Sequence, residues 1–86
     1  MENFRNVIYQ LISDKIGVDK TVLTDSTDFY DDLGVDSLDF IELMADIEVS
    51  LGIVIEEEVY EKLKTVGTLI KQVEKKLKAR MNQLPV

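Results

Sequence analysis

The residues best suited to chemistry lie in the stretch "DDLGVDSLD", residues 31 to 39, where the hydroxyl of Ser37 stands among four aspartates. A serine hydroxyl is a poor nucleophile unless a base removes its proton, and the usual base is an imidazole. The 86-residue chain contains no histidine, and it contains no cysteine that could act in place of the serine. An ordinary serine nucleophile is therefore excluded.

The surroundings of Ser37 also lack the other groups that catalysis requires. From Thr21 to Glu61 the sequence holds thirteen acidic residues and no lysine or arginine that could serve as base or oxyanion donor. The segment "GVDSL" lacks the second glycine of the G-x-S-x-G elbow, and there is no glycine-rich phosphate loop. We therefore expect no catalytic residues and no enzymatic activity.

The aspartates before and after Gly34 raise the question of a calcium loop. An EF-hand needs glycine at its sixth position and a carboxylate at its first. Counting back from Gly34 puts Phe29 at the first position, which excludes an EF-hand. We expect no resident metal, although weak surface binding of divalent cations stays open for the aspartates of this loop, which are Asp25, Asp28, Asp31, Asp32 and Asp36.

The elements that must position Ser37 are helices, since only four glycines and one proline interrupt the chain. Apolar residues at helical spacing predict a first helix over residues 3 to 16, ended by Gly17. After a long loop, a second helix is predicted from Asp36, whose carboxylate can cap free backbone N–H groups, to Gly52. Its core stripe comprises Phe40, Leu43, Met44, Ile47 and Leu51.

Two further helices are predicted in the last third of the chain. A short acidic helix covers "EEEVYEKL", and a last helix begins after Thr65, which acts as its cap. Residues 81 to 86 are expected to fray. The predicted fold is all-α, one domain over residues 1 to 86 that forms a small bundle of three longer helices and one short helix. The inward residues of the last two helices are Val59, Tyr60, Leu63, Val66, Leu69, Ile70, Val73 and Leu77.

Ser37 then falls in the first turn of the second helix. Serine is favoured there for purely structural reasons. Here, however, Asp36 can already serve as the cap, so the Ser37 hydroxyl is spare. A helix N-terminus also stabilises an attached phosphate through its backbone dipoles. The position suits either a structural serine or a modified one.

Charge divides the chain into an acidic part and a basic part. The net charge is −7, yet from Lys62 onward seven basic residues face a single acid, Glu74. The acidic part repels nucleic acid phosphates and favours basic protein surfaces. The start "MENFRN" shows no signal-peptide pattern, and no apolar run is long enough to span a membrane. We expect a cytoplasmic monomer that neither binds nucleic acid nor inserts into a membrane.

The segment "DLGVDSLDFIELMADIE", residues 32 to 48, closely resembles the signature of acyl carrier proteins, in which D-S-L follows an L-G-x turn and the serine carries a phosphopantetheine arm. The similarity covers nearly the whole chain. The segment "KIGVDKTVLTDSTDFYDDLG" is similar to the family's first loop, and "IEEEVYEKLKTVGTLIKQV" to its third and fourth helices. The resemblance implies that Ser37 holds phosphopantetheine through a phosphodiester, with an acyl group on its thiol. A phosphopantetheinyl transferase would supply the missing base.

The resemblance also implies a docking face for acyl-transferring and ketosynthase-type enzymes that carry basic patches. The positions that match this face in the family are Asp36, Leu38, Asp39, Ile41, Glu42 and Glu48. Helical spacing independently places Leu38, Ile41 and Ala45 on one stripe, with Asp39, Glu42 and Asp46 near it. In the family the acyl chain enters among inward residues, which here are Phe29, Phe40, Leu43, Met44, Ile47 and Leu63.

Several positions depart from the family pattern. Val49 stands where another acid is common, and Phe40 stands where a smaller side chain is frequent. These departures leave open a general fatty-acid carrier and a dedicated carrier of a polyketide, lipid A or other specialised pathway. Phe40 is either core alone or also a limit on how far a chain enters. The alternative function is an unmodified acidic helical module that binds a basic partner protein.

Overall fold

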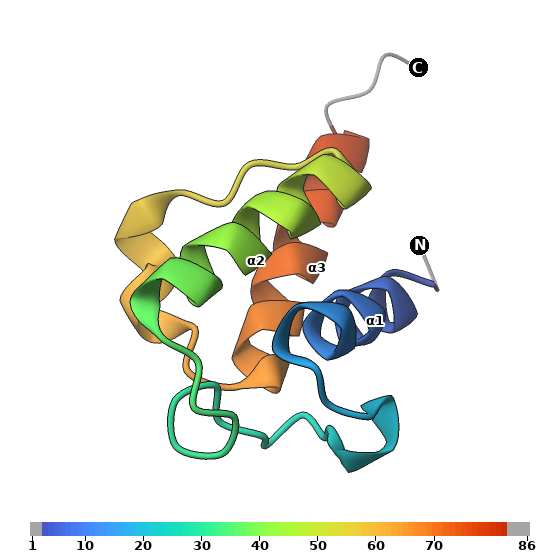
Figure 1. Ribbon diagram of the computed structural model, residues 1–86. Helices are drawn as coiled ribbons and strands as arrows, with labels where there is room; N and C mark the ends of the chain where they lie inside the picture. The colour runs from blue at the N-terminus through green and yellow to red at the C-terminus, as the bar shows by residue number, and fades with distance from the viewer. Residues whose placement is uncertain (1–2, 83–86) are drawn as a thin grey trace.

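The chain folds into three long helices and two short 3-10 helices (Figure 1). The computed structural model describes residues 3 to 82. Over these residues no strand forms, and there is only an isolated bridge between Asp28 and Thr65. The prediction of an all-α fold is confirmed. The long helices are α1 (Phe4–Ile16), α2 (Ser37–Leu51) and α3 (Val66–Asn82), and the short ones are η1 (Lys20–Val22) and η2 (Glu57–Lys62).

The ends of the long helices follow from the residues that stand there. Gly17 ends α1 and Gly52 ends α2, both in the left-handed conformation that glycine adopts without steric cost. Asp36 caps α2, and its side chain accepts a hydrogen bond from the Asp39 amide. The Thr65 hydroxyl accepts a hydrogen bond from the Thr68 amide at the start of α3. These four predicted boundaries are confirmed.

The short elements differ in part from the prediction. The expected short acidic helix is present as η2, a 3-10 helix. The other, η1, is a single turn within the long loop that the sequence patterns did not indicate, and it is capped by Asp19, which accepts from the Thr21 amide. At the other end of the chain α3 continues to Asn82, and residues 83 to 86 of the expected tail lie outside the described residues.

The long loop between α1 and α2 is held against the start of α3. The Phe29 amide donates to the Lys64 carbonyl over 2.9 Å, and the Val66 amide donates to the Thr27 carbonyl over 3.0 Å. The Gly67 amide donates to the Asp25 carbonyl over 2.7 Å, an approach so close that a Cβ on residue 67 would lie 2.8 Å from that oxygen. These hydrogen bonds fix the position of the loop that leads to Ser37.

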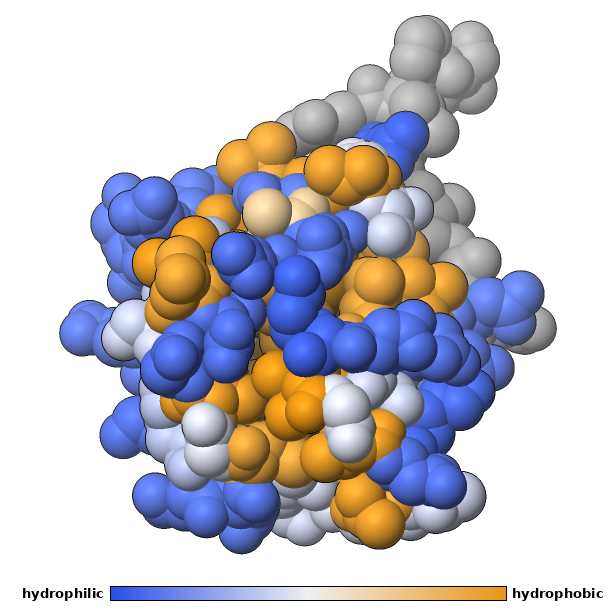
Figure 2. All heavy atoms as spheres, in the orientation of Figure 1, coloured by the Kyte–Doolittle hydropathy of each residue, from blue (hydrophilic) through white to orange (hydrophobic). Residues whose placement is uncertain are grey.

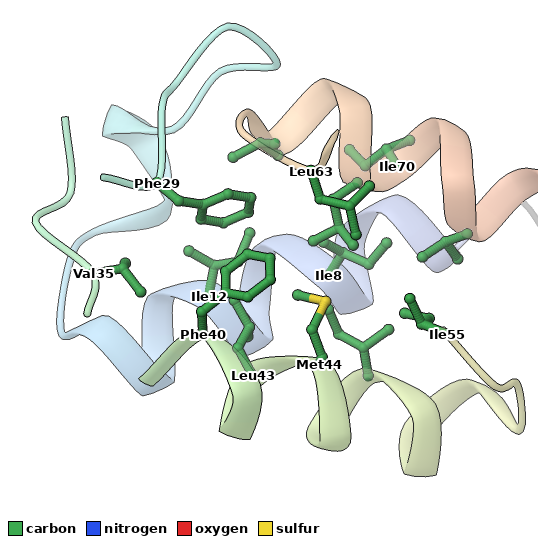
Figure 3. Close-up of a cluster of buried hydrophobic side chains, with 14 of the residues drawn as sticks. Ile8, Ile12, Phe29, Val35, Phe40, Leu43, Met44, Ile55, Leu63 and Ile70 are labelled. Atoms are coloured by element: carbon green, nitrogen blue, oxygen red, sulfur yellow. The ribbon is translucent and has the colours of Figure 1, made fainter. Parts of the chain in front are cut away.

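The core lies between the three long helices and the loop (Figure 3). The predicted stripe of α2 is buried from Phe40 to Ile47, whereas Leu51 at the end of the helix is half-buried. The five predicted inward residues of α3 are all buried, and the loop contributes Leu23, Phe29 and Val35. Burying an apolar side chain of this kind stabilises a fold by about 1.5–3 kcal/mol. The core thus fixes the helix that begins at Ser37.

Candidate functional site

Ser37 is the first residue of α2, and its side chain is exposed. The turn before it uses Gly34 at a φ of 64°, and Val35 then anchors the chain, since its side chain is buried and its amide donates to the Phe29 carbonyl over 3.0 Å. Asp36 Oδ1 accepts from the Asp39 amide over 2.8 Å, which confirms the predicted cap. The hydroxyl is thus presented at a rigid junction between loop and helix.

The start of α2 leaves backbone donors beside this hydroxyl. The first turn of a helix has N–H groups without intrahelical partners. Of these, the Asp39 amide is taken by Asp36, while the amides of Ser37 and Leu38 make no hydrogen bond within residues 3 to 82. The Ser37 hydroxyl likewise makes none within the same residues. Donors of this kind, together with the helix dipole, stabilise a phosphate group at this position.

A small hollow of about 220 Å³ opens at Ser37. Aromatic rings form its wall, with the Phe40 ring centroid 5.5 Å from that of Tyr60 and 6.0 Å from that of Tyr30. Tyr30 was not among the predicted site residues, although its place directly after Phe29 in an anchored loop is the signal that would have indicated it. The lining residues are Tyr30, Ser37, Phe40, Ile41, Tyr60 and Glu61.

The six residues predicted to receive an acyl chain are all buried in the common core. Of the six, only Phe40 lines the hollow beside Ser37. Phe40 also packs edge-to-face against Phe29, with ring centroids 5.4 Å apart. The structure therefore separates a surface hollow from the buried core, and the Phe40 ring forms the boundary. The six are Phe29, Phe40, Leu43, Met44, Ile47 and Leu63.

The predicted docking face lies along the outer side of α2. Leu38 is 65% exposed and Ile41 50% exposed, and Ala45 follows on the same stripe. Figure 2 shows apolar and hydrophilic side chains interleaved on the side of the molecule that α2 crosses. An apolar strip among carboxylates suits a partner that presents basic groups around an apolar centre. The acidic residues of this face are Asp39, Glu42 and Asp46.

A lysine of α1 reaches this acidic face. Lys15 Nζ lies 3.3 Å from Asp46 Oδ2 and 3.5 Å from Glu42 Oε1. The hydrogen bond to Asp46, together with the charges of Asp46 and Glu42, raises the pKa of the Lys15 ammonium. Sequence patterns gave no signal for this contact, because it depends on how α1 packs against α2.

Glu48, another residue of the predicted docking face, has a role within the fold. Its side chain is half-buried, and Oε2 accepts from the Ile55 amide over 2.7 Å. This bond ties the last turns of α2 to the segment that leads to η2. One carboxylate oxygen of Glu48 is therefore already engaged before any partner arrives.

Comparison with known proteins agrees with the geometry. Residues 6–73 match the family model described as "Phosphopantetheine attachment site". The chain is also 38% identical over 76 residues to an acyl carrier protein of Thermotoga maritima, an alignment that covers 88% of this chain and 94% of that protein. The chain belongs to the acyl carrier protein family. The group that this family carries is phosphopantetheine, and its members act as carriers.

The residues at the start of α2 fit such a group. An exposed hydroxyl adjoins a hollow with apolar walls and two backbone amides that make no hydrogen bond to the described residues. When bound, the arm supplies a terminal thiol on which an acyl group is held as a thioester. What the chain offers such a group is the exposed Ser37 hydroxyl, the backbone amides beside it and the adjacent hollow.

Two of the loop aspartates, Asp28 and Asp32, stabilise the loop itself. Asp28 Oδ1 accepts from the amides of Tyr30 and Asp31, and Asp32 Oδ2 accepts from the Asp28 amide. Within the described part of the chain, no group of three or more acidic residues is arranged to hold a metal ion.

None of the described helices is both long and apolar enough to cross a bilayer.

Proposed function

We propose that Ser37 carries the phosphopantetheine arm and that this chain delivers acyl intermediates to enzymes of fatty acid or a related specialised biosynthesis. The observation that carries the proposal is the place of Ser37, exposed at the N-terminus of α2 with Asp36 acting as the helix cap. Because a different residue caps the helix, the fold does not need the serine hydroxyl. The Ser37 hydroxyl is therefore available for modification.

The attachment step requires a second protein. The phosphopantetheine comes from a donor that holds it through a diphosphate. Ser37 Oγ forms the new bond to the pantetheine-side phosphorus, the diphosphate P–O bond breaks, and the rest of the donor leaves with the other phosphate. The Ser37 proton goes to a base on the phosphopantetheinyl transferase, since the chain has no histidine. Asp36 holds the helix start in place, and the Leu38 amide faces the site where the phosphate forms. The chain acts as the acceptor in this reaction.

Partner enzymes then recognise the outer face of α2. Leu38 and Ile41 supply apolar contact area, and Asp39 supplies a carboxylate that has no ion pair within the described residues. Complementary charge mainly accelerates encounter and excludes wrong partners. We expect Glu42 and Asp46 to contribute less than Asp39, because Lys15 already offsets their charge. Glu48 would contribute through its remaining oxygen only.

The test of attachment is the intact mass after co-expression with a phosphopantetheinyl transferase, which distinguishes a carrier from an unmodified acidic module. The parent chain should gain the mass of one phosphopantetheine, and Ser37→Ala should gain none. Ser50→Ala is the matched control, since Ser50 is also an exposed serine of α2 but lies far along the helix. A modified Ser37→Ala protein would end this proposal.

We further expect the carrier to act as a cytoplasmic monomer.

A further inference from the structure

The hollow beside Ser37 ends inward at the Phe40 ring. That ring is only 2% exposed, and it is in contact with three other aromatic rings. Tyr30 is stacked on it at an interplanar angle of 29°, while Phe29 and Tyr60 meet it edge-to-face at 76° and 78°. The wall that separates the hollow from the core is therefore an interlocked aromatic cluster, defined here as Phe29, Tyr30, Phe40 and Tyr60.

Any chain that moves from the hollow into the core must displace this cluster. In Figure 3 the Phe40 ring lies beside Phe29, and Leu43 and Met44 follow Phe40 along α2. Phe29 and Met44 are completely buried, so a displaced Phe40 ring would have to move against buried core side chains. Protein cores are packed as densely as organic crystals, and moving a ring without a vacancy strains its neighbours. The cluster closes the path from Ser37 to the inner residues of α2.

We propose that the hollow is the binding site for the acyl group and that it selects short groups that carry no negative charge, with planar conjugated or aromatic groups preferred. This inference rests on the proposed attachment at Ser37. The hollow, at about 220 Å³, is smaller than the roughly 300 Å³ at which typical small-molecule pockets begin, so it holds only a short segment. Tyr30 and Tyr60 line the hollow, and aromatic rings favour stacking partners. Glu61 at the rim disfavours acyl groups that end in a carboxylate.

The first test measures thermal stability of the loaded carrier as the acyl chain lengthens. Hexanoyl and decanoyl forms of the parent should differ in Tm by less than about 1 °C, because the added methylenes stay in water. In Phe40→Val the same extension should raise Tm by at least about 4 °C, the shift expected for burying roughly one more methylene in a domain of this size. A rise in the parent as large as in Phe40→Val overturns the proposal.

Val73→Ala is the matched control for a weakened core. Val73 is fully buried on α3 but does not line the hollow. It should lower the Tm of every form and leave the hexanoyl and decanoyl forms level with each other. A length-dependent gain in Val73→Ala equal to that in Phe40→Val would show that general loosening, and not the aromatic cluster, controls access to the core.

The preference for planar groups is tested with two rings of similar size. The benzoyl form should melt at least about 2 °C above the cyclohexanecarbonyl form, because only the benzoyl ring can stack on the tyrosines. In Tyr30→Leu the difference should shrink, because only Tyr60 remains as a stacking partner. Equal melting of the two forms in the parent overturns this part of the proposal.

A second probe keeps the test independent of enzymatic attachment. The chain has no cysteine, so Ser37→Cys offers a unique thiol for hexyl and decyl disulfides. Both tethered chains should give nuclear Overhauser contacts with Tyr30 and Tyr60 and none with Met44 or Ile47. Contacts of the decyl chain with Met44 overturn the proposal. A parent chain that never gains the arm would defeat the proposed function, whereas the tethered series would still decide what the hollow holds.

Discussion

Lys15 of α1 lies within 3.3 Å of Asp46 and 3.5 Å of Glu42, so an internal cation occupies part of the acidic face of α2. These pairs are partly exposed, since the Glu42 and Asp46 side chains keep 51% and 45% of their surface. Exposed ion pairs contribute little to stability. Their effect falls on recognition, because a basic partner must compete with Lys15 for the same carboxylates.

Replacing Lys15 by Gln should therefore accelerate transfer to a partner with a basic patch by about twofold to fivefold at low salt, a factor set by the usual strength of exposed pairs. Asp39→Lys should slow the same reaction more than Glu42→Lys, because Asp39 is not offset by Lys15. Lys20→Gln is the matched control, since it removes an equal charge from an exposed lysine of η1. The acceleration by Lys15→Gln and the slowing by Asp39→Lys should both become smaller as salt is added, because charges are screened beyond about 10 Å at 0.1 M. If Lys15→Gln and Lys20→Gln gave equal transfer rates, Lys15 would not compete with the partner for the carboxylates of Glu42 and Asp46.

The roles of Asp36 and Ser37 at the start of α2 can be separated by their effects on folding. Ser37→Ala should leave the free energy of unfolding within about 0.5 kcal/mol of the parent, since an exposed side chain without a hydrogen bond is removed. Asp36→Ala should lose about 1 kcal/mol, because the Asp39 amide loses its acceptor, and Asp36→Asn should recover most of it. Urea unfolding of the three variants checks the order. If Ser37→Ala is as unstable as Asp36→Ala, the serine belongs to the cap.

The sequence predicted the parts of this molecule that depend on neighbouring residues along the chain. Helix ends follow from local chemistry, and the boundaries at Gly17, Asp36, Gly52 and Thr65 were therefore readable in advance. The core stripes follow from helical periodicity for the same reason. Contacts between elements were not readable, because helix spacing says nothing of how α1 lies on α2. Thus the contact of Lys15 with α2 was missed, and Glu48 was assigned to the surface without its bond to the Ile55 amide. Tyr30 was missed although its place directly after Phe29 was a usable signal.

Glu48 offers a way to distinguish a role in the fold from a role in docking. Glu48→Ala should lose about 1–3 kcal/mol of unfolding free energy, because the amide of the buried Ile55 is left without its acceptor. Glu48→Gln keeps an acceptor oxygen and should stay closer to the parent, while it removes the charge. Transfer rates of Glu48→Gln then report on docking alone. Unchanged rates in Glu48→Gln together with reduced stability in Glu48→Ala would assign the residue to the fold.

The Asp25 carboxyl should make the free energy of unfolding depend on pH in the acidic range. Arg5 Nη2 donates to both Asp25 oxygens over 2.9 Å, and the Tyr9 hydroxyl donates to Oδ1 over 2.8 Å. The hydrogen bond from Arg5, then that from Tyr9, lowers the pKa of the Asp25 carboxyl from its ordinary value. A carboxyl with a lowered pKa in the folded state stabilises the fold above its unfolded pKa, about 3.9, and this contribution is lost as pH falls through the lower folded value.

The protein should therefore lose stability below about pH 4, and this loss should be seen only when both Arg5 and Asp25 are present. The effect should be modest, because the Arg5 and Asp25 side chains are each 49% exposed and water screens the pair. Arg5→Gln removes the largest cause of the lowered pKa, so the Asp25 carboxyl should titrate at a higher pH, which NMR can follow directly. Tm of the parent should exceed that of Arg5→Gln at neutral pH, and the difference should shrink as the pH falls through the folded pKa of Asp25. A difference that stays constant across this range would mean that Arg5 stabilises the protein through packing of its side chain and not through the carboxylate.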